Sequence, residues 1–209
     1  LILVLTHAHI DHWYHMDEFE TVYMCHREFE VGPDALRDMM ADKELHPERT
    51  LDIRTDTRIE LGGTALSVCE VPGHTPGSVV VLDERSNRLF TGDAIGSGYG
   101  VWMQTPTAVP LETYYESLVH LLKWLVDRGG RMTFHGGHRY QMFQSTHVPA
   151  FNPPSLGLLC DLIDLVDQIV HGKIVGRISN VDNIMELEPV LYAAYGRAEI
   201  QYKASNIRI

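Results

Sequence analysis

A short stretch near the start of the chain concentrates side chains that can bind a metal ion: His7, His9, Asp11 and His12 lie within six consecutive positions. They directly follow the apolar run 1–5, which is typical of a buried strand. Imidazole nitrogen and carboxylate oxygen are ligands that Zn²⁺ accepts. Alternation along an extended chain points His7 and His9 to the same side. A bend after them turns Asp11 and His12 another way, so the stretch predicts two adjacent metals rather than one.

Further donors occur later in the chain. His74, Asp93 and His138 each follow a short apolar or β-branched run, and each lies beside a glycine. Glycine lets the backbone turn sharply and approach a ligand closely. Two metals need more than four donors, and these residues supply them, with His135 as an alternative to His138. A chance cluster of histidines on a surface loop is less favoured once the later donors are included.

Four motifs together carry a resemblance to a known family: HAHIDH from His7, PGHTPGS around His74, TGD ending at Asp93 and GGH ending at His138. In this order they resemble the metallo-β-lactamase superfamily of dinuclear hydrolases, over about two thirds of the chain. The resemblance implies an α/β fold, an αββα sandwich of two mixed sheets flanked by helices. Relatives usually place several strands before the first motif, whereas this chain begins at Leu1. We therefore expect a fragment without those strands.

The resemblance also assigns a role to each donor. Three imidazoles would hold the first metal, and a carboxylate with two imidazoles the second: His7, His9 and His74, then Asp11, His12 and His138. Asp93 would bridge both metals, and Asp11 and Asp93 would be the catalytic carboxylates. His138 matches the family's Gly-His pattern better than His135 does. Zinc lowers the pKa of a bound water from about 16 to about 7, so a bridging hydroxide would attack a carbonyl or phosphoryl centre.

Asp93 narrows the implied chemistry. In the superfamily, true β-lactamases carry another residue here, whereas glyoxalase II-like thioesterases, lactonases and phosphodiesterases carry Asp. The resemblance therefore implies a hydrolase with two Zn²⁺ ions that acts on a small ester, thioester or lactone. Iron or manganese is also compatible with these ligands. The alternatives are a phosphodiesterase, a one-iron oxidoreductase similar to persulfide dioxygenases, and a non-catalytic scaffold protein, which the complete ligand set disfavours.

Residues near the motifs are candidates for substrate contact. The segment 94–109 follows the TGD motif and is first glycine-rich and then bulky. We expect it to form a substrate wall through Tyr99 and Trp102. Arg139 could clamp a carboxylate or phosphate, or be a solvated arginine at a strand end. Trp13 stands where relatives usually place small residues, and we expect it to reshape the pocket wall.

Composition limits the class of protein. The 209 residues are 44% hydrophobic and 22% charged, as in a soluble globular protein. We expect one domain over 1–209, with a metal-binding core at 1–150 and an extension at 151–209. The net charge of −11 argues against a nucleic-acid surface, and no apolar run approaches the ~20 residues of a membrane span. We therefore expect a cytoplasmic enzyme with a small-molecule substrate, and a homodimer is compatible with the sequence.

The rest of the sequence predicts alternating strands and helices. Glycine-rich or polar turns separate pairs of apolar runs, and apolar residues later recur at helical spacing. The predicted strands are 21–24, 58–61 with 65–68, and 78–82 with 88–90. Residues 190–195 and 199–202 are predicted as a closing pair of strands, or as a strand and a short helix. The predicted helices are 26–42, interrupted by Gly32-Pro33, 111–125 and 156–170. Cys25, Cys69 and Cys160 are expected to be buried thiols, with Cys160 on the apolar face of the last helix.

Overall fold

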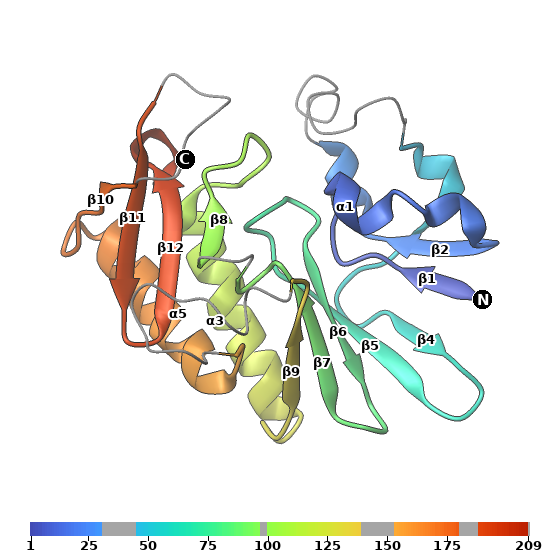
Figure 1. The fold of residues 1–209 in the computed structure, drawn as a ribbon. Coiled ribbons are helices and arrows are strands. Elements are labelled where there is room, and N and C mark those ends of the chain that lie inside the picture. The colour runs from blue at the N-terminus through green and yellow to red at the C-terminus, as the bar shows by residue number, and fades with distance from the viewer. Residues whose placement is uncertain (31–44, 97–99, 139–152, 180–187, 209) are drawn as a thin grey trace.

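A computed structural model describes residues 1–30, 45–96, 100–138, 153–179 and 188–208 (Figure 1). The N-terminal part forms a small parallel sheet of three strands: β1 (Ile2–Val4), β2 (Thr21–Met24) and β3 (Leu51–Asp52). Its connections contain α1 (Ile10–Trp13) and the 3₁₀ segments Met16–Glu18, His26–Glu30 and Pro47–Arg49. Buried apolar side chains on these elements, Trp13 and Met24 among them, form a core of their own. The strands β1 and β2 were predicted at 1–5 and 21–24, whereas β3 and the pairing of the three strands were not.

A five-stranded mixed sheet forms the centre of the molecule. Its order is β4-β5-β6-β7-β9, and its bounds are β4 (Arg58–Glu60), β5 (Ala65–Glu70), β6 (Val79–Asp83), β7 (Arg88–Gly92) and β9 (Thr133–Gly136). Both predicted hairpins, β4–β5 and β6–β7, are confirmed, and β9 adds parallel to β7. The backbone N–H of Val79 donates to the carbonyl oxygen of Thr6 at 2.8 Å, which joins the end of the first strand segment to this sheet.

A second mixed sheet contains the C-terminal strands. Its order is β10-β11-β12-β8, with β10 (Arg177–Ile178), β11 (Val190–Tyr195), β12 (Ala198–Lys203) and β8 (Val101–Met103). The antiparallel pair β11–β12 confirms the predicted closing strands. β8 pairs parallel with β12, so the segment after the TGD motif is held by the C-terminal end of the chain.

Two long helices lie between these sheets (Figure 1). Helix α3 (Leu111–Asp127) packs on β5 and on α5 (Leu156–Val170), and α5 packs on β11 and β12. One large core results, to which both helices and both mixed sheets contribute. Gly129 and Gly130, with φ of 91° and 64°, follow the end of α3, because a left-handed backbone is cheap only for glycine. The Ser155 side chain caps α5 by accepting from the Leu158 N–H.

The buried face of α5 does not include Cys160, contrary to the prediction, although Leu159, Val166 and Val170 are buried. Leu158, Leu162 and Leu165 are buried, whereas Leu156 and Ile163 are only partly so and Cys160 is exposed. The prediction for Cys160 is therefore wrong: nearly every position of this helix except the aspartates is apolar, so the spacing does not fix a unique face. Cys25 and Cys69 are buried as expected, and burial raises the pKa of both thiols to about 12.

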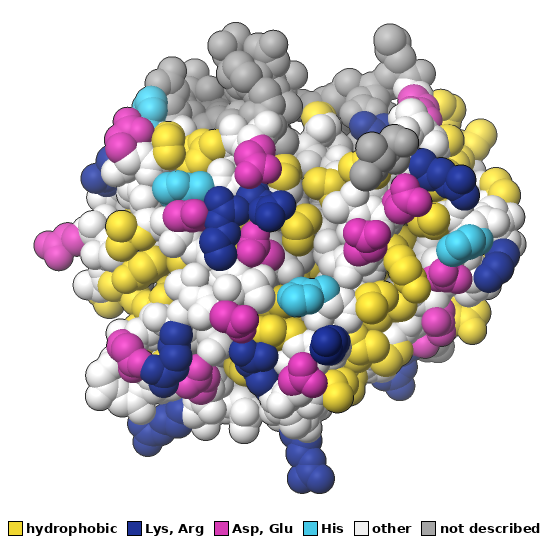
Figure 2. Space-filling view, turned by 180° about the vertical axis from the view of Figure 1, so that it is seen from behind, with side chains coloured by type: hydrophobic (Ala, Val, Ile, Leu, Met, Phe, Trp, Pro, Cys, Tyr) yellow, Lys and Arg dark blue, Asp and Glu magenta, His cyan; other side chains and the backbone are white. Residues whose placement is uncertain are grey.

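The α/β class with mixed sheets flanked by helices is confirmed. Of the predicted helix 26–42, the residues 26–30 form a 3₁₀ segment, and 31–42 lie outside the described residues. None of the helices in the described ranges combines the length and apolarity needed to cross a membrane. On the face shown in Figure 2, acidic and basic side chains are interspersed rather than separated.

The contact between α3 and α5 should contribute strongly to stability. Leu162 is fully buried in the shared core, so Leu162→Ala removes apolar contacts and leaves a cavity, which costs about 2–5 kcal/mol. We expect that loss in the free energy of unfolding measured by urea denaturation. Val126→Ala is the control, because Val126 is 57% exposed on α3 and should change stability by less than about 0.5 kcal/mol. Equal losses in the two variants would contradict the packing described.

Candidate metal centre

The first ligand motif lies where β1 gives way to α1. His9 is extended, with φ −72° and ψ 141°, and the helix begins at Ile10. The extended segment therefore carries His7 and His9, and the first helical turn carries Asp11 and His12. Trp13 is buried below this loop and donates its indole N–H to the carbonyl oxygen of Ala8 at 3.0 Å. The prediction that Trp13 reshapes a pocket wall is wrong, because its ring packs into the N-terminal core.

The structure brings all seven predicted ligands together. In each of three groups the donor atoms lie within 4.8 Å of one another: His7, His9 and His74; His7, His12 and Asp93; and Asp11, His12 and His138. Asp93 Oδ2 is 3.7 Å from His74 Nε2, 3.9 Å from His12 Nε2 and 3.1 Å from His138 Nε2. One carboxylate oxygen thus lies between the imidazoles of the first and third groups.

The spacing of the donors suits a metal ion. Two nitrogens bound to one tetrahedral zinc at about 2.0–2.1 Å lie roughly 3.3 Å apart, and His12 Nε2 and His138 Nε2 are 3.3 Å apart. His7 is 1% exposed, and among the described residues its Nε2 atom has no hydrogen-bond partner. A buried polar atom without a partner costs about 1–3 kcal/mol. A cation bound by the first group would satisfy that atom, so the residues present fit a metal.

Hydrogen bonds behind the cluster orient its rings. His74 Nδ1 donates to the carbonyl oxygen of Trp102 at 2.7 Å, and His9 Nε2 lies 3.3 Å from Thr107 Oγ1. A ligand histidine whose outer nitrogen is held in this way presents the other nitrogen to the metal in a fixed direction. The sequence did not single out Thr107, because nothing local marks a threonine that contacts a histidine 98 positions away.

Electrostatics keep most of the rings neutral. Burial, followed by the neighbouring imidazoles, lowers the pKa of His7 far below its ordinary value and that of His9 to about 2. Burial also lowers the pKa of His74. The pKa of His138 is raised, chiefly by its hydrogen bond to Asp93. Neutral imidazole is the form that binds a metal, so the rings of His7, His9 and His74 are in the form that can act as ligands at neutral pH.

Glycine is required where the last motif passes the cluster. A Cβ atom at Gly137 would lie 2.5 Å from Asp93 Oδ1 and 3.0 Å from His12 Cε1. The Gly137 N–H donates to the carbonyl oxygen of Gly92 at 3.0 Å. The backbone of this segment therefore fits between the predicted bridge and a predicted ligand, which brings His138 close to both.

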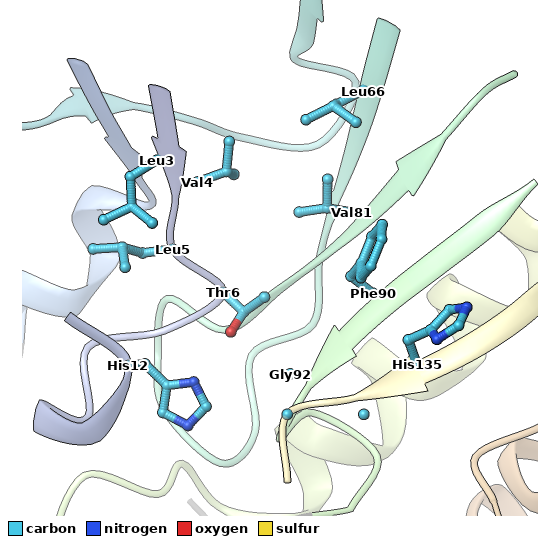
Figure 3. A pocket seen from close by; sticks show the side chains of 12 residues that line it. Leu3, Val4, Leu5, Thr6, His12, Leu66, Val81, Phe90, Gly92 and His135 are labelled. Carbon is cyan, nitrogen blue, oxygen red and sulfur yellow. The ribbon is translucent and has the colours of Figure 1, made fainter. Parts of the chain in front are cut away.

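His135, the alternative last ligand, lies elsewhere. Its ring stacks on Phe90 with 5.4 Å between centroids, and it belongs to none of the donor groups found among the described residues. It lines a pocket of about 320 Å³ between β1 and the five-stranded sheet, whose wall also includes Leu3, Thr6, His12, Val81 and Gly137 (Figure 3). His12 and His135 lie on different sides of this pocket, which is mostly apolar.

The predicted substrate contacts are placed only in part. Trp102 lies on β8, and its backbone carbonyl accepts from His74, so it lies beside the cluster as predicted from its position after Asp93. Its role as a substrate wall stays a prediction. Tyr99 and Arg139 lie outside the described residues. Glu28, which the sequence did not mark, is buried next to the ligand loops.

Comparison with known proteins agrees with the ligand motifs. The sequence profile of the metallo-beta-lactamase superfamily matches residues 1–138. The chain is 26% identical, over 141 residues, to the metallo-beta-lactamase fold-containing protein ST1585 of Sulfurisphaera tokodaii, covering 56% of this chain and 53% of that protein. The crystal structure of ST1585 aligns with a TM-score of 0.51 at 17% identity, over 88% of this chain and 73% of that one.

Two further relatives have names that state an activity. Human acyl-coenzyme A thioesterase MBLAC2 is 28% identical over 150 residues, which are 62% of this chain and 52% of that protein. Hydroxyacylglutathione hydrolase of Bartonella quintana is 30% identical over 97 residues, 46% of this chain and 34% of that enzyme. The chain spans about half the length of the first curated relatives that it matches, or less.

The lowered pKa of His9 predicts a pH-dependent stability of the metal-free protein. Between about 6.5 and the folded pKa of about 2, His9 binds more protons in the unfolded state, so its contribution to stability falls as the pH drops. Glu28 and His138, whose pKa values are raised, act in the opposite direction. Comparison with His9→Ala isolates the effect of His9.

We expect the wild type to lose up to about 2 kcal/mol relative to His9→Ala between pH 7 and pH 5. Urea denaturation of both proteins in the presence of a chelator measures this difference. A constant difference across that range would show that His9 is solvated rather than buried among other imidazoles.

Proposed function

The chain belongs to the metallo-beta-lactamase superfamily, and on this premise we propose that it is a dinuclear zinc hydrolase of a small ester, thioester or lactone. One observation carries the proposal: Asp93 Oδ2 lies within 3.9 Å of imidazole nitrogens from three separate segments. A carboxylate in that position can contact two cations at once. His7, His9 and His74 would hold the first zinc, and Asp11, His12 and His138 the second, with Asp93 contacting both.

Two zinc ions in this site would supply a hydroxide at neutral pH and polarise the electrophilic carbonyl. The residues of the chain prepare the site for that chemistry. Burial keeps His7, His9 and His74 in the neutral form that binds metal. Asp93 is 4% exposed in its side chain, so its negative charge acts in a medium that screens it little.

The two halves of the site differ in access to solvent. His7 and His74 are buried, whereas the side chains of Asp11 and His138 are 55% and 33% exposed. Asp11 Oδ2 lies 3.4 Å from His138 Nε2. A substrate must therefore approach from the side of Asp11 and His138. At this opening Asp11 is a carboxylate that solvent and substrate can reach, which supports its proposed catalytic part.

A thioester is the substrate class that the relatives favour. One relative is named an acyl-coenzyme A thioesterase and another a hydroxyacylglutathione hydrolase. Both names state a hydrolytic reaction on a thioester. The match covers only part of each relative, so the activity and the substrate of the whole protein rest on this proposal and on its test.

Asp93→Ala should abolish hydrolysis while leaving the fold largely intact. Removing the shared carboxylate would deprive both zinc ions of a ligand, and we expect turnover to fall by about 10²–10³-fold, as when a transition-state contact is lost. The assay is hydrolysis of an acyl-coenzyme A, a hydroxyacylglutathione, a simple ester and a lactone by zinc-loaded protein. Asp17→Asn, an exposed carboxylate on a neighbouring 3₁₀ segment, is the control. Undiminished turnover in Asp93→Ala would refute the mechanism.

Metal content tests the two-site assignment directly. Elemental analysis of protein purified without chelator should give about two zinc ions per chain, as two-metal sites require. His74→Ala removes a ligand of the first site only, so about one zinc should remain. His15→Ala should keep both, because His15 is an exposed residue paired with Glu18. Two zinc ions in His74→Ala, or a single iron in the wild type, would contradict the assignment.

A further inference from the structure

Glu28 is a carboxyl group buried directly behind the candidate metal centre. It lies in the 3₁₀ segment His26–Glu30 and is 1% exposed. Its Oε1 atom accepts from the hydroxyl of Thr75 at 2.5 Å. The backbone N–H groups of Ala8 and Gly77 also donate to this carboxyl. An isolated carboxyl would be costly at this depth, so these three donors are what make its burial acceptable.

The three donors belong to the two loops that carry the ligands of the first metal. Ala8 lies between His7 and His9, and Thr75 follows His74 directly. Glu28 therefore links the first loop to the loop that begins at His74. In the first loop Glu28 contacts a backbone N–H group, and in the second loop it contacts a hydroxyl and a backbone N–H group. These contacts leave the imidazole rings of both loops available to bind the metal.

The loop around Gly77 is shaped to receive this carboxyl. A Cβ atom at Gly77 would lie 2.6 Å from Glu28 Cγ and 2.8 Å from the Glu28 backbone nitrogen, so only glycine permits the approach. Thr75 is also held within its own loop, since its hydroxyl lies 2.8 Å from Ser78 Oγ and its N–H donates to the same atom at 3.2 Å. The contact is thus a closed, fully buried network.

We infer that Glu28 is a positioning residue that holds the loop of His7 and His9 against the loop of His74, so that three nitrogens of the first site are in place before a metal binds. The inference rests on the proposed two-metal centre. Groups that orient ligands from behind typically change metal affinity by about 10–100-fold when they are removed. A residue that only stabilised the fold would change the unfolding free energy and leave the metal affinity unchanged.

The test compares two substitutions that differ in hydrogen bonding. Glu28→Leu fills similar space but leaves both N–H groups and the hydroxyl without an acceptor. Glu28→Gln keeps one oxygen acceptor and should retain most of the function. We expect Glu28→Leu to raise the Zn²⁺ dissociation constant of the tighter site by about 10–100-fold, and Glu28→Gln by only a few-fold. Competition with a chromophoric chelator measures both, and Co²⁺ absorption reports the ligand geometry.

Glu70→Gln is the matched control. Glu70 is a partly buried carboxylate. It accepts from the Thr55 N–H and pairs with Arg27 and Arg54. None of these partners belongs to a ligand loop. We expect Glu70→Gln to lower the unfolding free energy of the metal-free protein but to leave the Zn²⁺ affinity and the Co²⁺ spectrum unchanged.

Unchanged zinc affinity and an unchanged Co²⁺ spectrum in folded Glu28→Leu would overturn the inference and leave the proposed function standing. If Glu28→Leu does not fold, Thr75→Val carries the test, because it deletes one donor and keeps the carboxyl. A several-fold weaker first site in Thr75→Val would support the inference, and wild-type affinity would overturn it. A wild-type protein that binds no Zn²⁺ would overturn both the inference and the proposed function.

Discussion

The site depends on two imidazole nitrogens that face each other at 2.9 Å, His9 Nδ1 and His74 Nε2. His74 already uses its Nδ1–H on the carbonyl oxygen of Trp102, so its Nε2 presents a lone pair when the ring is neutral. In the metal-free protein a single proton on His9 Nδ1 can lie between the two nitrogens while both rings stay neutral, and burial lowers the pKa of both rings. A divalent cation would replace that proton and bind both nitrogens. It would also reach His7 Nε2, for which the described part of the chain offers no hydrogen-bond partner.

The fold meets this constraint by bringing strand ends to one place. The ends of β1, β7 and β9 supply His7, Asp93 and His138, and the backbone bond from Val79 to Thr6 ties the first of these segments to the central sheet. β8 is held in place by β12, which fixes the carbonyl that orients His74. The C-terminal strands therefore act on the site through Trp102, although they contribute none of the seven predicted ligands.

The sequence predicted best what is local or carries a distinctive motif. The hairpins were predictable because turn residues such as Gly62-Gly63 separate runs of matching pattern, and the seven donors because each lies in a short motif. The buried face of α5 was not, since its apolar residues surround Cys160 on several sides. Glu28 could not be predicted either. Two of its three donors are backbone N–H groups of distant segments, and a backbone donor has no sequence signature.

The wrong prediction for Trp13 has a related cause, a hydrogen bond to a backbone group. Its bulk suggested a pocket wall, but its indole N–H found an acceptor in the carbonyl of Ala8. A Trp that is buried needs such a partner, and the ligand loop provides it. Trp13 thus donates a hydrogen bond to Ala8, between His7 and His9, and Glu28 accepts one from the same residue.

The two halves of the candidate metal centre differ in burial, and this difference bears on which half would bind metal firmly and which would meet the substrate. At His9 and His74, desolvation removes the proton that would compete with a cation, whereas at His138 the hydrogen bond that the ring donates to Asp93 favours that proton. Under the proposed function, the buried half is therefore suited to hold a metal permanently, and the exposed half to exchange with water and substrate. Because metal ligands do not contact what lies beyond the scissile bond, selection among substrates would then come from side chains around Asp11 and His138. Fold and function are separate claims, and the site rather than the fold has to support the second.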